Sequence, residues 1–170
     1  FLQAGCLIEP VPADEKGMDV SRLPKKDVSA VYLTPSHQFP LGGILPAGRR
    51  AVAIRYAAAK DVYLIEDDYD SEFRYAGEPV SPLYAMAPQR VIYVGTFSKV
   101  LFPALRIGYV ILPRKLQEAW RILRMHTDVQ NAPFEQAALA EFLQTRKFDR
   151  HIRTMRKLYG ARRKVLLECL

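Results

Sequence analysis

Three short polar segments carry side chains that could do chemistry, and each directly follows a run of apolar residues. Residues 34–43 include hydroxyl groups and a histidine, residues 66–72 include several carboxylates, and residues 95–99 end in a lysine. Arg106 follows that lysine seven residues later. In open α/β sheets, ligands bind beyond the carboxyl ends of the strands, so these segments are the first candidates for a functional site.

The third segment and its surroundings match the chemistry of a phosphate-bearing aldehyde. The Lys99 amine is a potential nucleophile in its neutral form. Thr96, Ser98 and Arg106 offer hydroxyl groups and a guanidinium fork, which suit the oxygens of a phosphate. Asp67, after another apolar run, would place a carboxylate beside them. A lysine, a carboxylate and a phosphate-binding set together are what pyridoxal phosphate requires.

The apolar runs also predict the elements that must position these segments. Continuous apolar runs predict strands over residues 31–34, 62–65, 91–94 and 107–112. Composition and helical spacing predict helices over residues 46–60, 81–86, 114–125, 133–143 and 147–170, with Ser81 as the N-cap of the second. Strands that alternate with helices indicate an α/β fold with a mostly parallel sheet.

Two further expectations concern the sheet. The apolar run over residues 62–65 is continuous, as in a strand that is buried on both faces. Only residues 95–106 separate the last two predicted strands, which is short for a parallel crossover. We therefore expect the strand at 107–112 to run antiparallel to its neighbour.

The composition is that of an ordinary folded domain. The 170 residues are 49% hydrophobic and 25% charged, with a formal net charge of +7, which excludes a disordered or collagen-like chain. No apolar run reaches the roughly 18 residues that a transmembrane helix needs. Cys6 and Cys169, near opposite ends, exclude a disulfide scaffold and a cysteine metal motif. They fit a reducing compartment, so we expect a cytoplasmic protein.

The positive charge is local. Nine of the 25 basic residues lie within residues 146–164, where Asp149 is the one acid. A basic helix can bind nucleic acid or another anionic surface. Apolar residues recur beneath the charges at helical spacing, and no aromatic residues interleave on the charged face, so we favour the solvated face of an amphipathic helix. The apolar residues are Phe148, Ile152, Met155, Tyr159 and Leu166.

Taken together and in this order, the motifs resemble a known family. Fold-type-I aminotransferases carry an aspartate, lysine and arginine set similar to Asp67-x-Tyr69, Gly95-Thr-Phe-Ser-Lys99 and Leu105-Arg106-Ile-Gly-Tyr109. More narrowly, the MocR-type transcription regulators carry segments that resemble Thr34-Pro-Ser-His-Gln-Phe-Pro40 and Glu66-Asp-Asp-Tyr-Asp-Ser-Glu-Phe-Arg-Tyr75. Those regulators fuse an N-terminal winged helix–turn–helix domain of the GntR type to an aminotransferase-like domain.

The resemblance implies a role for each matching residue. Lys99 matches the lysine that holds pyridoxal 5'-phosphate as an internal aldimine, and Asp67 matches the aspartate that pairs with the pyridine nitrogen. Tyr69 matches the tyrosine that hydrogen-bonds the phenolic oxygen of the ring. Arg106 matches the phosphate-binding arginine. The hydroxyl groups that flank the same phosphate belong to Thr96 and Ser98.

The loop at residues 34–43 departs from the aminotransferases. Many active relatives have Asn-Pro-Thr-Gly where this chain has Phe39-Pro-Leu-Gly42, and a phenylalanine cannot donate to the phenolic oxygen as asparagine does. Tyr69, with His37 or Gln38, must then make that hydrogen bond, although His37 is equally well an ordinary loop histidine. The phenylalanine is typical of the regulator branch and favours a regulator over a metabolic enzyme.

The resemblance also implies the architecture and the partners. We expect a three-layer α/β sandwich with a mostly parallel sheet, which is part of the large domain of fold-type-I transferases. Residues 1–145 would form the central part of that domain, and residues 146–170 a helix leading towards a smaller C-terminal domain. The partners would be a second copy in a homodimer and an amino compound or pyridoxal phosphate as effector. DNA would be bound only through a domain outside this chain, with no role at a membrane.

The chain begins at Phe1 and stops within a helical pattern, so we expect a fragment of a longer protein. Alone, it should be inactive and bind the cofactor poorly. Two alternatives stay open: a fragment of a metabolic class I or II aminotransferase, and a nucleic-acid-binding module built on residues 146–164.

Several other residues have a functional and an ordinary interpretation. Asp68, Asp70 and Glu72 could bind a divalent cation. No glycine turns the loop between Asp67 and Arg74, so we favour a solvated acidic rim. Gly42 and Gly43 could form a phosphate turn, but a loop leading into the next helix is favoured. The helix residues that we expect to be exposed without a role are His126 and His151.

Overall fold

The computed structural model describes residues 1–74, 80–128 and 130–170 of the chain. The chain divides into two compact units. The first unit comprises Phe1–Asp68, Val80–Val94 and Ile111–Pro113, and the second comprises Tyr69–Pro79, Gly95–Val110 and Arg114–Leu170. Tyr75, the last residue of the second regulator-like motif, lies outside the described residues.

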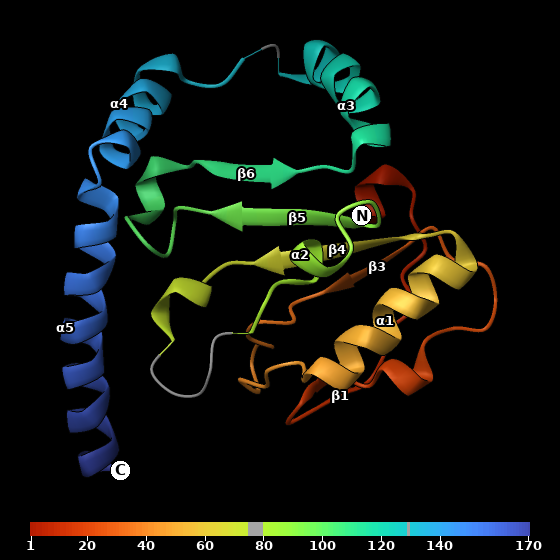
Figure 1. The fold of residues 1–170 in the computed structure, drawn as a ribbon, viewed down its shortest axis with the longest axis horizontal. Coiled ribbons are helices and arrows are strands. Elements are labelled where there is room, and N and C mark those ends of the chain that lie inside the picture. The colour runs from red at the N-terminus through yellow and green to blue at the C-terminus, as the bar shows by residue number, and fades with distance from the viewer. Residues whose placement is uncertain (75–79, 129) are drawn as a thin grey trace. The chain divides into compact units, whose positions relative to one another are not determined.

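Strands and helices alternate along the chain (Figure 1). The strands are β1 (Ala13–Asp14), β2 (Gly17–Met18), β3 (Ala30–Leu33), β4 (Tyr63–Asp68), β5 (Val91–Thr96) and β6 (Gly108–Ile111). The α-helices are α1 (Ala47–Lys60), α2 (Leu83–Met86), α3 (Arg114–Thr127), α4 (Pro133–Gln144) and α5 (Lys147–Cys169). Short 3-10 turns are η1 (Leu2–Ala4), η2 (Val20–Arg22), η3 (Ser71–Phe73) and η4 (Pro103–Leu105). Each strand and helix predicted from the sequence is confirmed, whereas β1 and β2 were not predicted.

The main sheet has the strand order β3-β4-β5-β6. β3 pairs with β4 in parallel, with Leu33 opposite Glu66. β6 runs antiparallel to β5, as the short connection predicts. The Phe97 N–H donates to the Ile107 oxygen at 3.1 Å, and the arrows of the two strands point in opposite directions (Figure 1). β1 and β2 form a separate antiparallel hairpin.

The apolar core of the first unit forms on one side of β4. The residues buried in it include Val31, Leu33, Ala53, Ala57, Leu64, Leu83 and Val91. Along β4, burial alternates: Leu64 is buried, whereas Tyr63 and Ile65 are half-buried. The expectation of a strand buried on both faces is therefore wrong for this chain, because the core contacts of the described residues gather on the Leu64 side.

A buried carboxylate caps the N-terminus of α2. The two carboxylate oxygens of Glu66, which is fully buried, accept hydrogen bonds from the backbone N–H groups of Leu83 and Tyr84, each at 2.9 Å. Pro82 is the N-cap residue, and no side-chain cap comes from the residues before the helix. The prediction that Ser81 caps α2 is wrong, because a carboxylate distant in sequence satisfies the free N–H groups.

The guanidinium group of Arg50, on α1, lies next to the carboxylate of Glu66. Its side chain is 1% exposed and donates to the backbone oxygens of Pro35 (2.7 Å), Leu45 (2.8 Å) and Ser81 (3.0 Å). Arg50 Nη1 lies 3.8 Å from Glu66 Oε1. Burial raises the pKa of Glu66, while the two backbone N–H groups and the charge of Arg50 oppose that rise.

In the second unit, α5 has one apolar side, as its sequence predicts. Ile152 is buried, and Phe148, Met155 and Tyr159 are half-buried. Leu166 differs from the prediction: it is 59% exposed, because none of the described residues buries this end of the helix. The nine basic residues of 146–164 are exposed, as expected for a solvated face. No helix among the described residues is long and apolar enough to cross a membrane.

The strands β5 and β6 approach each other closely where the segment 95–99 begins. A side chain at Gly95 would clash with the ring of Tyr109, and one at Gly108 would lie 3.1 Å from the Gly95 oxygen. The Tyr109 ring also contacts the ring of Phe97, with centroids 5.4 Å apart. Glycine is therefore needed at position 95 to admit the Tyr109 ring.

Replacing Arg50 with Met should lower the free energy of unfolding by about 3–5 kcal/mol near neutral pH, because Glu66 would lose the cation beside its buried carboxylate. The folded-state pKa of Glu66 lies above its ordinary value of 4.5, so the cost of its charge grows as the pH rises from there. The loss of unfolding free energy caused by Arg50→Met should therefore be smaller below about pH 4, where the carboxyl group of Glu66 is protonated in both the folded and the unfolded chain. Urea unfolding at the two pH values measures the difference.

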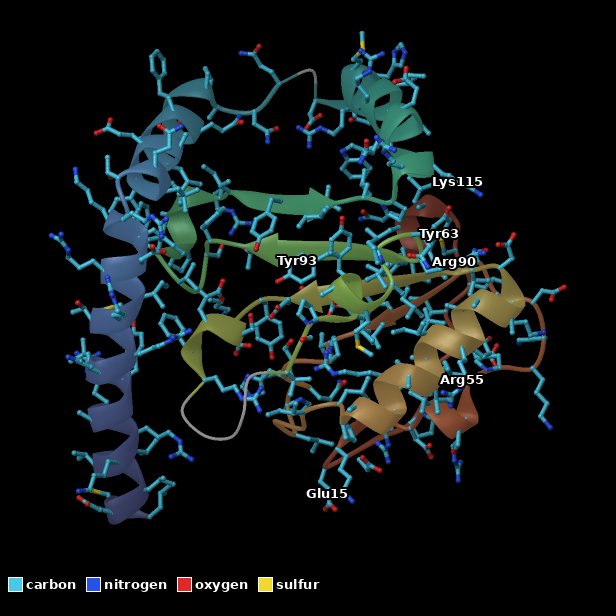
Figure 2. All side chains as sticks on the ribbon, viewed as in Figure 1. Glu15, Arg55, Tyr63, Arg90, Tyr93 and Lys115 are labelled. Atoms are coloured by element: carbon cyan, nitrogen blue, oxygen red, sulfur yellow. The ribbon has the colours of Figure 1, made fainter. Side chains whose placement is uncertain are left out.

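The matched control is Arg55→Met. Arg55 lies on the same helix with an exposed side chain (Figure 2). Its replacement should change the free energy of unfolding by no more than about 0.5 kcal/mol. Equal losses for the two variants, or a loss for Arg50→Met that does not depend on pH, would contradict the buried pair.

Replacing Gly95 with Ala should lower the free energy of unfolding by about 1–3 kcal/mol, because the added methyl group displaces the Tyr109 ring. In a Tyr109→Ala background the same change should cost less. Gly48→Ala is the control: its methyl group meets open space on α1, and it should stabilise the chain by up to about 1 kcal/mol. Urea unfolding of the double-mutant cycle tests this, and a penalty that is equal in both backgrounds would rule out the clash.

Candidate functional site

Asp67 lies in the first unit, next to the end of β4. Its Oδ2 atom accepts a hydrogen bond from the hydroxyl group of Tyr32 at 2.5 Å. Tyr32 reaches it from β3, where it pairs with Ile65. The side chain of Asp67 is half-buried, and its Oδ1 atom has no hydrogen bond from the described residues. One carboxylate oxygen is thus oriented by Tyr32, and the other is open.

Asp68 points to the opposite side of β4. It is 8% exposed, and its Oδ2 atom accepts a hydrogen bond from the hydroxyl group of Tyr93 at 2.7 Å. Its buried Oδ1 atom has no partner in the described part of the chain. The predicted solvated acidic rim is therefore wrong for Asp68, because alternate residues of a strand face opposite sides. Among residues 1–74, 80–128 and 130–170, no three potential metal ligands gather into a cluster.

The loop at residues 34–43 also belongs to the first unit. The Gln38 N–H donates to the Gly43 oxygen at 2.8 Å, which closes a tight turn. A side chain at Gly42 would meet His37 Nε2 at 3.7 Å, and one at Gly43 would lie 2.5 Å from the backbone oxygen of Glu15. The glycines therefore serve a close approach of the loop to the β1–β2 hairpin, which supports the loop interpretation over a phosphate turn. His37 itself is exposed.

The lysine-bearing turn lies in the second unit. The Ser98 N–H donates to Thr96 Oγ1 at 3.1 Å, and the Leu101 N–H donates to the Phe97 oxygen at 2.9 Å. Lys99 lies within this turn with an exposed side chain. It makes no ion pair or hydrogen bond with the residues that the structure describes. Its amine is therefore accessible to a ligand.

Arg106 follows in the same unit, after η4. It has a left-handed backbone, with φ 52°, and its side chain is exposed. Nη1 donates to the Pro103 oxygen at 3.4 Å, and no acidic side chain of the described residues pairs with it. Two cations, at 99 and 106, thus stand without acidic partners in a segment that also offers two hydroxyl groups. Such a donor set suits a phosphate monoester.

The seven predicted site residues are divided between the two units. Asp67 and His37 lie in the first unit. The second unit holds Tyr69, Thr96, Ser98, Lys99 and Arg106. Thr96 and Ser98 are joined by the hydrogen bond described above. That all seven surround one ligand stays a prediction.

Sequence reasoning missed two aromatic residues. Tyr32, which holds Asp67, looks like an ordinary strand residue, and only the pairing of β3 with β4 brings it to the carboxylate. Tyr109 is part of a quoted motif, but its contact with Gly95 depends on the antiparallel register of β5 and β6. The sequence held one signal: a glycine within an apolar strand often marks close approach of a neighbour.

Comparisons with known proteins agree with the fold and the motifs. The sequence profile of the family "aminotransferase class I and II" matches residues 17–170. Among curated proteins, YdeL of Bacillus subtilis, described as an uncharacterized HTH-type transcriptional regulator, is 42% identical over 165 residues, which are 96% of this chain and 35% of YdeL. PdxR of Corynebacterium glutamicum, described as an HTH-type pyridoxine biosynthesis transcriptional regulator, is 42% identical over 160 residues, which are 94% of this chain and 35% of PdxR.

Among solved structures, the kynurenine aminotransferase of Pyrococcus horikoshii, crystallised in complex with PMP, superposes with a TM-score of 0.86. It is 33% identical, and the match covers 93% of this chain and 42% of that one. The predicted fold class, part of a fold-type-I transferase domain with a mostly parallel sheet, is thereby confirmed. The chain spans about a third of the length of the curated relatives. On this profile match over nearly its whole length, the chain belongs to the class I and II aminotransferase family.

Proposed function

We propose that this chain is part of the pyridoxal-phosphate-binding domain of a MocR-type transcription regulator of the GntR family, with the cofactor held on Lys99. YdeL and PdxR, which match nearly the whole chain, are both named as HTH-type regulators. The family and the PMP in the kynurenine aminotransferase support the cofactor. The observation that carries the proposal is the exposed amine of Lys99 in one unit with Arg106, both without acidic partners among the described residues.

The second unit supplies groups for the aldehyde and the phosphate. The Lys99 amine would attach to the aldehyde carbon. The Arg106 guanidinium would bind the phosphate as a fork, and the hydroxyl groups of Thr96 and Ser98 would donate to its oxygens. The hydrogen bond from the Ser98 N–H to Thr96 Oγ1 fixes the Thr96 hydroxyl within the turn.

In this proposal, the remaining groups would contact the ring. Pyridoxal phosphate, when bound, would supply a ring that withdraws electrons from the bonds at the carbon that carries the amino group of an amino compound. Asp67 would hold a proton on the ring nitrogen, because an adjacent carboxylate favours the protonated form. The hydrogen bond from Tyr32 orients Oδ2 and leaves Oδ1 open for this contact. Tyr69, with His37 or Gln38, would donate to the phenolic oxygen.

The regulatory step belongs to the whole protein. An amino compound or pyridoxal phosphate would act as the effector, and it must bind one conformation better than the other in order to shift the population. DNA would be bound by a domain outside this chain, in a cytoplasmic homodimer. The division into a cofactor domain at residues 1–145 and a connecting helix at 146–170 stays part of this proposal.

A metabolic aminotransferase is the second candidate, because the Pyrococcus horikoshii enzyme is 33% identical. Phe39 favours the regulator. Its side chain is 77% exposed and offers no donor at the position where the resemblance places the asparagine of active enzymes. Turnover of amino and keto acids by the full-length protein separates the two candidates.

Replacing Lys99 with Ala in the full-length protein should abolish covalent attachment of pyridoxal phosphate, because the proposed attachment is through the Lys99 amine. Borohydride reduction, followed by peptide mass mapping, should find the label on the peptide that contains Lys99 in the wild type. Lys115→Ala is the control, since Lys115 is exposed on α3 of the same unit. Undiminished labelling of the Lys99→Ala variant would remove the assignment.

The regulator proposal predicts that an effector amino compound changes the affinity of the loaded full-length protein for DNA by about tenfold, in the range of ordinary coupling energies. Fluorescence anisotropy with operator DNA measures this change, and a parallel assay follows consumption of the amine. Fast turnover with no change in DNA affinity would favour the metabolic enzyme instead.

A further inference from the structure

One peptide unit beside Lys99 has both of its polar groups fixed. The N–H of Leu101 donates to the Phe97 oxygen at 2.9 Å. The carbonyl oxygen of Val100, in the same peptide unit, lies 2.8 Å from Nε2 of His151 on α5. A carbonyl oxygen can only accept, so Nε2 of His151 carries the proton and donates it. His151 thus completes the hydrogen bonding of the turn that holds Lys99.

His151 also differs from its prediction. The sequence predicts an exposed helix residue, as His126 proves to be, but His151 is half-buried. Its ring lies 6.4 Å from the ring of Phe142 on α4, measured between centroids. The partner of its Nε2 is 51 positions away in the chain, so helical spacing gave no indication of the contact.

Apolar contacts hold the same turn against α5. The side chain of Val100 is 2% exposed. The ring of Phe97 meets the ring of Phe148 on α5 edge to face, with centroids 5.9 Å apart. These contacts determine where the turn lies, but they do not fix the rotation of the peptide unit between Val100 and Leu101. The hydrogen bond from His151 does so together with the bond from the Leu101 N–H to the Phe97 oxygen, because both are directional.

The same helix contacts the segment that follows Tyr69. Arg156 Nε donates to the backbone oxygen of Glu72. The rings of Tyr159 and Phe73 meet edge to face, with centroids 5.2 Å apart. α5 therefore contacts two segments of the second unit that lead to proposed cofactor-binding residues, and His151 is its polar contact with the Lys99 turn.

We propose that His151 is a positioning residue for Lys99: its Nε2–H, bound to the Val100 oxygen, sets the orientation of the turn from which the lysine reaches the cofactor. This inference rests on the proposed function, in which Lys99 holds pyridoxal phosphate. His151 itself need not touch the cofactor. Without it, the Val100 oxygen loses its donor, only the Leu101 N–H bond still restrains the peptide unit, and the amine of Lys99 samples more positions.

The test compares three variants of the full-length protein. His151→Leu removes the donor and keeps an apolar side chain against Phe142. His151→Gln keeps a terminal N–H group at a similar distance from the backbone. His126→Leu is the matched control on an exposed position of α3. For each, the dissociation constant of pyridoxal phosphate is measured from the visible absorption of the bound cofactor, and the melting temperature is measured without cofactor.

His151→Leu should weaken cofactor binding about tenfold, the effect of roughly one lost oriented hydrogen bond. His151→Gln should restore binding to within about twofold of the wild type, and His126→Leu should leave it unchanged. Equal binding by the Leu and Gln variants of His151 would overturn the proposal. The proposal would also be overturned if both variants of His151 lost cofactor affinity in proportion to their decrease in melting temperature, because a merely structural role predicts that pattern.

A second readout separates this proposal from the proposed function. If the wild type carries no cofactor on Lys99, the proposed function fails, and the positioning role is judged on the cofactor-free protein. Amide hydrogen exchange of residues 97–101 and the rate of Lys99 acylation should then both rise in His151→Leu and return in His151→Gln. Unchanged exchange and acylation would overturn the positioning role.

Discussion

The buried guanidinium group of Arg50 is the contact on which the first unit depends. It reaches from α1 to the loop before that helix, to the backbone at Ser81 ahead of α2 and to Glu66 on β4. A buried charge is costly unless it is paired and hydrogen-bonded, so losing one of these contacts would leave part of the charge of Arg50 or Glu66 uncompensated. Asp67 is the next residue of β4. The cluster around Arg50 therefore also fixes the acid that we propose for the cofactor ring.

Three consecutive acids on β4 have different surroundings because strand side chains alternate. Glu66 and Asp68 face the buried side, where one caps α2 and the other accepts a hydrogen bond from Tyr93. Asp67 faces the other side, where the Tyr32 hydroxyl group holds one of its oxygens. In the sequence, Glu66, Asp67 and Asp68 look like one acidic run. The geometry of the strand separates two structural acids from one functional candidate.

Local patterns predicted the helices and strands of the main sheet, and the antiparallel direction of β6, because these depend on spacing and connection length. Two of the errors, those at Ser81 and His151, involve partners distant in sequence. Ser81 has a hydroxyl group that could cap α2, but the first N–H groups of the helix donate to the carboxylate of Glu66 instead. His151 has the spacing of an exposed residue, but the Lys99 turn lies against it. Such contacts become visible only when the register of the strands and the packing of α5 are known. That the site residues surround one ligand stays a prediction.

Arg106 has the backbone conformation that glycine adopts most easily, with φ 52°. A side chain in this left-handed region costs roughly 1 kcal/mol, which glycine would recover. Selection for heat resistance alone would therefore favour losing the guanidinium group that we propose for the phosphate. A laboratory selection of this domain should therefore screen for ligand binding as well as for stability. Otherwise the most stable variants would lack the guanidinium group that we propose for the phosphate.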